Sequence, residues 1–178
     1  MSAIQRERTV AFTGHRSEKL PTEQGAIRAL KLRTYAAIDK AIQEGYGTFI
    51  MGACYGFDLL AAEQVLLRKQ VADHIGHPKI RLIAAVPHEH QAIHWKTADR
   101  ELYYDTLAQC DEVVTLNTHY RQGCFHERNR WMIDRASRLI CCYDGSGGGT
   151  GYTVDYARKS GLTIINLCET EESEKKRE

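Results

Sequence analysis

The sequence has little net charge, no long apolar run and no paired cysteine motif, and each absence excludes a class of protein. Its 24 basic and 23 acidic residues leave a formal net charge of +1, so the chain lacks the overall electrostatic footprint of a nucleic-acid or membrane-surface binder. No run of about 18 apolar residues occurs, and the start MSAIQRERTV has no apolar core of signal-peptide length. We therefore expect a soluble, cytoplasmic protein that binds neither membrane nor nucleic acid.

Six cysteines are present, but none belongs to a CxxC pair, and most lie inside apolar segments. This placement favours reduced, buried thiols over a disulfide framework. The HExxH metal motif is also missing: in the segment PHEHQAIHWK, His90 and His94 are four residues apart, but the glutamate precedes His90. We therefore expect no metal site and no obligatory cofactor.

Short β-rich segments alternate with longer helical patterns along nearly the whole chain. The expected strands are the apolar runs RTVAFTG, TFIMGA, RLIAAV, DEVVTLN, SRLICCYD and LTIINLC. Helical patterns cover residues 23–44, 58–73, 89–109, 125–136 and 152–160. This order predicts one α/β domain with a doubly wound, mainly parallel sheet and helices on both faces. The charged tail 169–178 is expected to be disordered.

In open parallel sheets ligands bind beyond the carboxyl ends of the strands, so the residues that follow each predicted strand are informative. Glycine there lets backbone N–H groups approach a ligand, and a helix N-terminus adds unpaired donors and a positive dipole end. The chain has this pattern twice, after the second and fifth strands, with an arginine after the first. We therefore predict a phosphate- or nucleotide-binding pocket. The residues at these ends are Gly14, His15, Arg16, Gly52, Ala53, Gly56, Asp58, Asp144, Gly148, Gly149 and Thr150.

Neither standard phosphate-binding signature is present. GxGxxG would need glycines at fixed intervals after the first strand, where only Gly14 is found, and no GK[ST] triplet closes a Walker loop. The ligand is therefore expected to be held neither as a kinase holds ATP nor as a dehydrogenase holds NAD.

Two further segments supply candidate ligand-binding side chains. Gln91 and Trp95 lie one helical turn apart and could offer an amide and an aromatic plane to a base, although a packed tryptophan is the equal alternative. Arg128, Asn129 and Arg130 lie near the start of a predicted helix, where cations oppose the helix dipole. An anion would compensate these arginines, and a weak set of surface ion pairs is the alternative.

Five segments, taken together and in order, resemble the YpsA-type branch of the SLOG superfamily: FTGHR, GACYGFDLLAAE, VPHEHQAIHW, GCFHERNRWMID and YDGSGGGTGYTVDYA. That superfamily comprises Rossmann-like proteins related to DprA and to the Lonely Guy cytokinin-activating enzymes. The resemblance implies a Rossmann-like domain over residues 1–168. It also implies a pocket for ADP-ribose, an NAD-like molecule or a nucleoside phosphate. Related folds often form homodimers, and the resemblance identifies no protein partner.

The enzyme branch of the superfamily carries a PGGxGTxxE loop whose glutamate cleaves a nucleoside 5′-monophosphate at the ribosyl bond. Aligning Gly149 and Thr150 with the GT of that loop puts Thr153 in the place of the glutamate. A threonine hydroxyl cannot stabilise an oxocarbenium-like state or activate water as a carboxylate does. We therefore favour a regulatory or sensory ligand binder. In this interpretation Gly148 to Thr150 cradle phosphate, Gly52 and Gly56 admit the ligand, and Arg16 and Arg128 supply positive charge.

Two alternatives stay open at this point. One is a nucleotide hydrolase or phosphoribohydrolase that uses Asp144 or Glu63 instead of the missing glutamate, although Asp144 could equally bind ribose hydroxyls. The other is a DprA-like binder of single-stranded DNA, which the near-zero net charge and the few candidate stacking aromatics disfavour. Asp58 has two interpretations as well, a helix cap and a ribose ligand.

Overall fold

A single sheet of six strands, with every neighbouring pair parallel, organises the computed structural model, which describes residues 3–75 and 79–168. The strand order is β4-β3-β2-β1-β5-β6. All six predicted strands are confirmed, as is the doubly wound α/β fold. The strands are β1 Thr9–Gly14, β2 Thr48–Met51, β3 Arg81–Val86, β4 Glu112–Thr115, β5 Arg138–Cys142 and β6 Thr163–Asn166.

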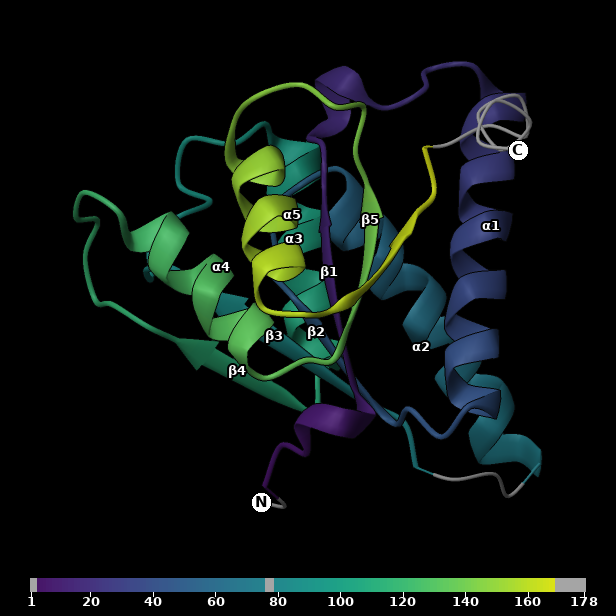
Figure 1. The fold of residues 1–178 in the computed structure, drawn as a ribbon. Helices are drawn as coiled ribbons and strands as arrows, with labels where there is room; N and C mark the ends of the chain where they lie inside the picture. The colour runs from purple at the N-terminus through teal and green to yellow at the C-terminus, as the bar shows by residue number, and fades with distance from the viewer. Residues whose placement is uncertain (1–2, 76–78, 169–178) are drawn as a thin grey trace.

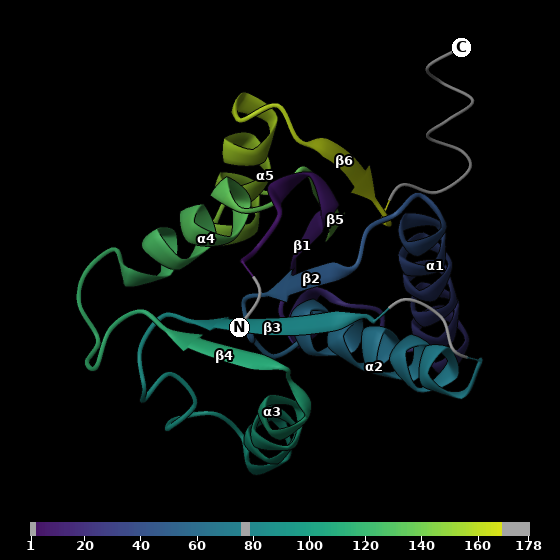
Figure 2. The same ribbon diagram turned by 90° about the horizontal axis from the view of Figure 1, so that it is seen from below.

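Helices cover both faces of the sheet, which buries the central strands on two sides (Figures 1 and 2). On one face α1 packs against α2, with α3 beside α2, and on the other face α4 packs against α5. Successive strand residues alternate between two cores: Phe12 belongs to the core under α1 and α2, and its neighbour Ala11 to the core under α4 and α5. The helices are α1 Gln24–Gln43, α2 Phe57–Ile75, α3 Thr97–Gln109, α4 Cys124–Asp134 and α5 Gly149–Lys159, with short 3₁₀ turns η1 Arg6–Arg8 and η2 Ser17–Lys19.

The strand order reverses at β1, and this reversal positions the site. β1 pairs with β2 on one side and with β5 on the other. The chain leaves β1 towards α1 on one face and leaves β5 towards α5 on the opposite face (Figure 2). The loops that follow β1 and β5 therefore diverge beyond the carboxyl ends of these strands. This is the place where open α/β sheets bind their ligands.

Two helix boundaries differ from the sequence prediction by three residues or more. The helix predicted over residues 89–109 begins only at Thr97, because the backbone amides of Gln91, Ile93 and Trp95 bond three residues back, as in turns. The prediction is therefore wrong for residues 89–96. α5 begins at Gly149 instead of residue 152, so its first turn consists of the glycines that the prediction had assigned to a loop.

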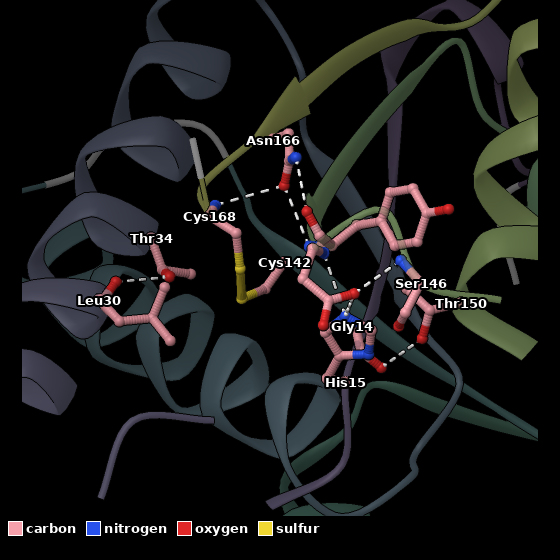
Figure 3. Close-up of a disulfide and its surroundings, with 11 residues drawn as sticks. Gly14, His15, Leu30, Thr34, Cys142, Ser146, Thr150, Asn166 and Cys168 are labelled. Atoms are coloured by element: carbon pink, nitrogen blue, oxygen red, sulfur yellow. Dashed lines mark hydrogen bonds and ion pairs between the residues drawn. A yellow bond between two sulfur atoms is a disulfide. The ribbon is translucent and has the colours of Figure 1, made fainter. Parts of the chain in front are cut away.

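Cys142 and Cys168 form a disulfide, which corrects the expectation that all the thiols are reduced (Figure 3). The parallel register sets Cys141 of β5 opposite Asn166 of β6, so the two following segments bring the bonded residues to a Cα–Cα distance of 5.0 Å. Asn166 reinforces the junction, since its side chain donates to Tyr143 O at 2.8 Å and accepts from Tyr143 N at 3.0 Å.

Removing this disulfide should destabilise the protein, because the bond closes a loop across 26 residues and so restricts the unfolded chain. For Cys168→Ser we expect a loss of about 2–4 kcal/mol in the free energy of unfolding, measured by urea denaturation without reductant. Cys110→Ser is the matched control, because Cys110 is a free cysteine. Alkylation of unreduced wild-type protein that labels both Cys142 and Cys168 would contradict the pairing.

Two further expectations concern the C-terminal tail and membrane-spanning helices. The predicted tail at 169–178 lies outside the described residues. Within residues 3–75 and 79–168, no helix has the length and apolar character needed to cross a membrane.

Candidate functional site

A cavity of about 400 Å³ opens at the carboxyl ends of β1, β2 and β5. Four segments contribute its lining: the chain after β1, the turn into α2, the N-terminal half of α4 and the glycine-rich loop into α5. Eight of the ligand-binding residues predicted from the sequence line it, so residues from distant parts of the chain do converge. These are Gly14, His15, Arg16, Asp58, Arg128, Asn129, Gly149 and Thr150.

The N-terminus of α5 forms one corner of the cavity. Its N-cap residue Gly148 has φ 123° and makes no side-chain capping bond. The first backbone N–H groups of a helix have no partner within the helix and carry the positive end of its dipole. Thr150 ties this corner to β1 through a 3.0 Å hydrogen bond from its Oγ1 to Gly14 O (Figure 3). Lys19 Nζ donates to Ser146 Oγ at 2.7 Å and also lines the cavity, so a cation lies beside the loop.

Arg128 lies under the cavity as a buried cation, with 4% of its surface exposed. Its Nη1 donates to Gly52 O and, at 3.4 Å, to Ala85 O, so the guanidinium joins the carboxyl ends of β2 and β3. Its Nε donates to Asn129 Oδ1 at 2.8 Å. A Cβ at Gly52 would lie 2.6 Å from Arg128 Cζ. This glycine therefore admits the guanidinium, and it does not line the cavity.

Gly56 also allows two segments of the chain to pack closely against each other. A Cβ there would lie 2.6 Å from both His15 O and the Arg16 Cα. The turn before α2 therefore lies directly against the segment after β1, and the hydrogen bond from Phe57 N to His15 O at 3.0 Å fixes the contact. Gly56 places cavity residues of two strands next to one another without lining the cavity itself.

Asp58 is the buried acid of the cavity, in the first turn of α2 and 6% exposed. Its Oδ2 accepts a 3.3 Å hydrogen bond from the Cys54 N–H, which belongs to the turn before α2. Burial raises the pKa of Asp58 to about 6, against the opposing effect of the Arg128 charge. A carboxyl group that titrates near neutral pH in a cavity can exchange protons with a ligand.

This pKa predicts a pH dependence of stability. The folded-state pKa of about 6 lies above the ordinary value of 3.8, so the folded protein binds the proton more tightly than the unfolded chain does. The favourable contribution of Asp58 is fully present below pH 4 and is lost as the pH rises through 6. The unfolding free energy of Asp58→Asn minus that of wild type should increase by about 2–3 kcal/mol between pH 4 and pH 7.5. Urea titrations at both pH values measure this difference.

Asp111→Asn is a control whose titration lies below the tested pH interval. Burial raises the pKa of Asp111, but hydrogen bonds from Lys69 and the Leu82 N–H outweigh burial and hold the pKa below its ordinary value. The stability contribution of Asp111 is present above pH 3.8 and is lost only as the pH falls below that value, so the difference between Asp111→Asn and wild type should stay nearly constant from pH 4 to pH 7.5. Parallel pH profiles for Asp58→Asn and wild type would contradict the assignment of a raised pKa to Asp58.

His15 and Asp144 form a pair at the edge of the cavity. His15 Nε2 lies 2.8 Å from Asp144 Oδ1 and 3.1 Å from the Asp144 backbone N. A protonated Nε2 donates to the carboxylate, and an unprotonated one accepts from the amide, so the two contacts alternate with the state of the ring. Hydrogen bonds from Ser146, with His15 adding to them, hold the pKa of Asp144 well below its usual range. Asp144 does not line the cavity, but His15 does.

The predicted pair Gln91 and Trp95 lies outside the cavity lining. Gln91 Nε2 donates to Ala53 O at 3.2 Å, which holds the segment of residues 89–95 against the turn after β2. Trp95 packs edge-on against Tyr55, with ring centroids 4.9 Å apart. In the described residues both side chains therefore make contacts between segments of the chain. Ala53, another predicted site residue, is also absent from the cavity lining.

Four other candidates also lie outside the lining. Arg130 Nη1 donates to Tyr152 OH at 2.9 Å, on the outer surface of α4 and α5. Thr153 is fully buried, and its hydroxyl donates to Gly149 O at 2.8 Å within α5. Glu63 is exposed and forms an ion pair with a lysine of α1 at 2.7 Å. Gly148 is the N-cap of α5, next to the lining residue Gly149.

Sequence reasoning missed several lining residues. Lys19 follows β1 in a 3₁₀ turn with no periodic pattern, so nothing in the sequence indicated its position. Phe125 and His126 fall within segment 123–134, whose arginines were the basis for predicting an anion-binding site there. The same convergence brings in Cys54 and Met132. The lining residues that the sequence did not predict include Lys19, Cys54, Phe125, His126 and Met132.

A comparison with models of protein families identifies the family of this chain. The model described as the YspA SLOG family matches residues 10–163. The chain belongs to the YspA SLOG family. The match covers all the segments that line the cavity and confirms the resemblance inferred from the five sequence motifs.

Relatives of this SLOG protein are found in bacilli. The UPF0398 protein BH1768 of Halalkalibacterium halodurans is 27% identical over 158 residues, which cover 85% of this chain and 81% of the relative. The uncharacterized SPbeta prophage-derived protein YoqJ of Bacillus subtilis is 29% identical over 147 residues, which cover 75% of this chain and 82% of the relative. The similarity therefore extends over most of both proteins in each pair.

Solved structures share the fold of this SLOG protein. DNA processing protein A from Helicobacter pylori superposes with a TM-score of 0.61 at 18% identity, covering 96% of this chain and 71% of that one. DprA from Streptococcus pneumoniae has a TM-score of 0.56 at 16% identity, covering 89% of this chain and 49% of that one. TM1055 has a TM-score of 0.52 at 15% identity, covering 88% of this chain and 72% of that one. At these identities the likeness concerns the fold alone.

Proposed function

We propose that the cavity binds a nucleotide or nucleotide-derived ligand that carries a phosphate, in a regulatory or sensory role in the cytoplasm. The ligand class is a nucleoside phosphate, ADP-ribose or an NAD-like molecule. The observation that carries this proposal is the N-terminus of α5, which has no side-chain cap and lines the cavity at the reversal point of the strand order. Backbone donors at such a terminus suit an anion.

The charges of the lining support an anionic ligand. Arg16, Lys19 and Arg128 line the cavity, and the acids Glu18 and Asp58 accompany them. Asp58 is half-neutralised near pH 6, because burial raises its pKa to about that value. The hydrogen bonds of Arg128 to backbone carbonyls do not cancel its charge, because carbonyls are neutral. The balance therefore favours a phosphate group.

Thermal shift against AMP, ADP, NAD, ADP-ribose and cyclic dinucleotides tests the proposal. A ligand at 100 times its Kd adds about 2.7 kcal/mol of stability, which raises the Tm by about 5–10 °C for a protein of this size. Gly149→Asp should abolish the shift, because it adds a carboxylate at the α5 N-terminus where a new Cβ meets no atom within 4 Å. Gly25→Asp makes the same change in the first turn of α1 and should leave the shift intact. No shift with any probe, or an equal shift in Gly149→Asp, would contradict the proposal.

A nucleotide hydrolase is the second candidate, and Asp58 favours it. This carboxyl group lines the cavity and has the raised pKa of a proton-transfer group, whereas the threonine at the usual glutamate position is buried within α5. His15, which also lines the cavity, lies 2.8 Å from Asp144 Oδ1. Product formation from AMP, NAD or ADP-ribose that is lost in both Asp58→Asn and Asp144→Asn would support turnover. Binding without product would support the ligand-binding function.

DNA binding is the remaining alternative. One structural neighbour is described by a single-stranded DNA binding mode, and that is a property of the Helicobacter pylori protein. For this chain, with a formal net charge of +1, we propose no nucleic acid partner. A gel shift with single-stranded DNA at low salt should therefore show no complex.

A further inference from the structure

Three aromatic rings stack along the outer surface of α4 and α5 and end at the cavity. His126 of α4 stacks on Tyr152 of α5 with ring centroids 4.2 Å apart and an interplanar angle of 15°. Tyr152 in turn lies nearly parallel to Tyr156, at 6.4 Å and 8°. Of the three, only His126 lines the cavity. The stack therefore connects the packing of α4 on α5 with the surface available to a ligand.

Polar contacts hold the two tyrosines in place. Arg130 Nη1 donates to Tyr152 OH at 2.9 Å, and Tyr156 OH donates to Asp134 Oδ1 at 2.8 Å. The hydrogen bond to Asp134 raises the pKa of Tyr156, so its hydroxyl remains protonated and keeps this bond at neutral pH. Each contact joins α4 to α5, so both tyrosine rings have fixed orientations before any ligand binds.

The fixed tyrosines set the position of the His126 ring. Tyr152 covers one face of the imidazole, so the exposed ring can contact the cavity only through its other face and its edges. Phe125 lines the cavity beside it. The cavity thus has aromatic rings on α4, whereas the uncapped helix N-terminus and Lys19 are on α5 and η2, and the Arg128 guanidinium of α4 lies 5.9 Å from the centre of the Phe125 ring. Aromatic rings and anion-binding groups in one cavity match a molecule that carries both a base and a phosphate.

We propose that His126 is the surface on which the nucleobase of the ligand stacks, with Tyr152 and Tyr156 as positioning residues. This inference rests on the proposed function and narrows the ligand class to compounds that keep their base, so a bare sugar phosphate is a poor ligand. Every base has a π-face, so stacking on one ring selects for the presence of a base more than for its identity.

Calorimetric titration of the whole protein with AMP and with ribose 5-phosphate tests the inference, because the two probes differ only by the base. Wild type should bind AMP at least about tenfold more tightly. His126→Ala should lower AMP affinity to the level of ribose 5-phosphate and leave ribose 5-phosphate binding unchanged. His126→Phe should keep the preference, because it retains a ring. Tyr152→Leu should weaken the preference more than Tyr152→Phe, which keeps the stacked ring and loses only the bond to Arg130.

The outcomes separate this inference from the function on which it rests. Equal binding of both probes to wild type would overturn the stacking role and leave a phosphate-binding site. A similar loss of both probes in His126→Ala would overturn it as well, because a collapsed cavity explains that result. Loss of the preference in His126→Phe would show that the ring does not act by stacking. Binding of neither probe to wild type would remove AMP-like nucleotides from the proposed function, and the inference with them.

Discussion

Replacing Arg128 with methionine is expected to destabilise the protein by about 4–6 kcal/mol, the largest effect we predict for a side-chain substitution. The substitution removes the donor of hydrogen bonds to two backbone carbonyls, Gly52 O and Ala85 O, from a side chain that is only 4% exposed. Each buried acceptor left unpaired costs about 1–3 kcal/mol. The positive charge that lowers the pKa of Asp58 is lost as well, so the buried carboxylate becomes costlier to keep ionised. These losses overlap, so their sum is an upper limit.

Arg130→Met provides the matched control for this prediction. It makes the same change two residues along α4, where the side chain is exposed and bonds only to Tyr152 among the described contacts. That variant should stay within about 0.5 kcal/mol of wild type in urea unfolding. The loss in Arg128→Met should be larger at pH 8 than at pH 5, because Asp58 is ionised only at the higher value. Equal stability of the two variants would mean that the buried guanidinium contributes no more than a surface one.

The strands were predictable from sequence because of their burial on both faces. β1, β2, β3 and β5 lie between two layers of helices, so nearly every residue in them is apolar and the runs stand out. The helix predicted from residue 89 was wrong because Gln91 bonds to Ala53, and no local periodicity reports a contact across 38 positions. The disulfide was missed for the same kind of reason, since only the register of β5 and β6 brings Cys142 and Cys168 together.

The candidate site was predictable in location and less so in detail. The ends of the predicted strands indicated the location of the site. The rule that ligands bind beyond the carboxyl ends of parallel strands requires only the order of helices and strands along the chain. Residue types alone could not separate a glycine that admits a ligand from one that admits another part of the chain. Gly149 lines the cavity, whereas Gly52 makes room for Arg128 and Gly56 for the segment after β1. The distinction depends on atoms that lie far away in the sequence.

Gly56→Ala should therefore cost about 2–5 kcal/mol although it adds a single methyl group. The residue has φ 95°, a left-handed conformation that costs an L-residue about 1–2 kcal/mol. The new Cβ would also lie 2.6 Å from His15 O and from the Arg16 Cα, which are backbone atoms that cannot rotate away. Forcing such an overlap costs about 1–3 kcal/mol more. The displacement of the segment after β1 should also weaken binding of AMP, because His15 and Arg16 line the cavity.

Gly45→Ala separates the two contributions to this cost. Gly45 has nearly the same φ, 93°, but a Cβ there would meet no atom within 4 Å, so this variant measures the backbone term alone. Urea unfolding should show a loss of about 1–2 kcal/mol for Gly45→Ala and about twice that or more for Gly56→Ala, with AMP binding preserved only in the former. Equal losses would mean that the segment after β1 yields easily to the added methyl group. In that case the close approach of this segment to the turn before α2 does not hold the cavity in shape.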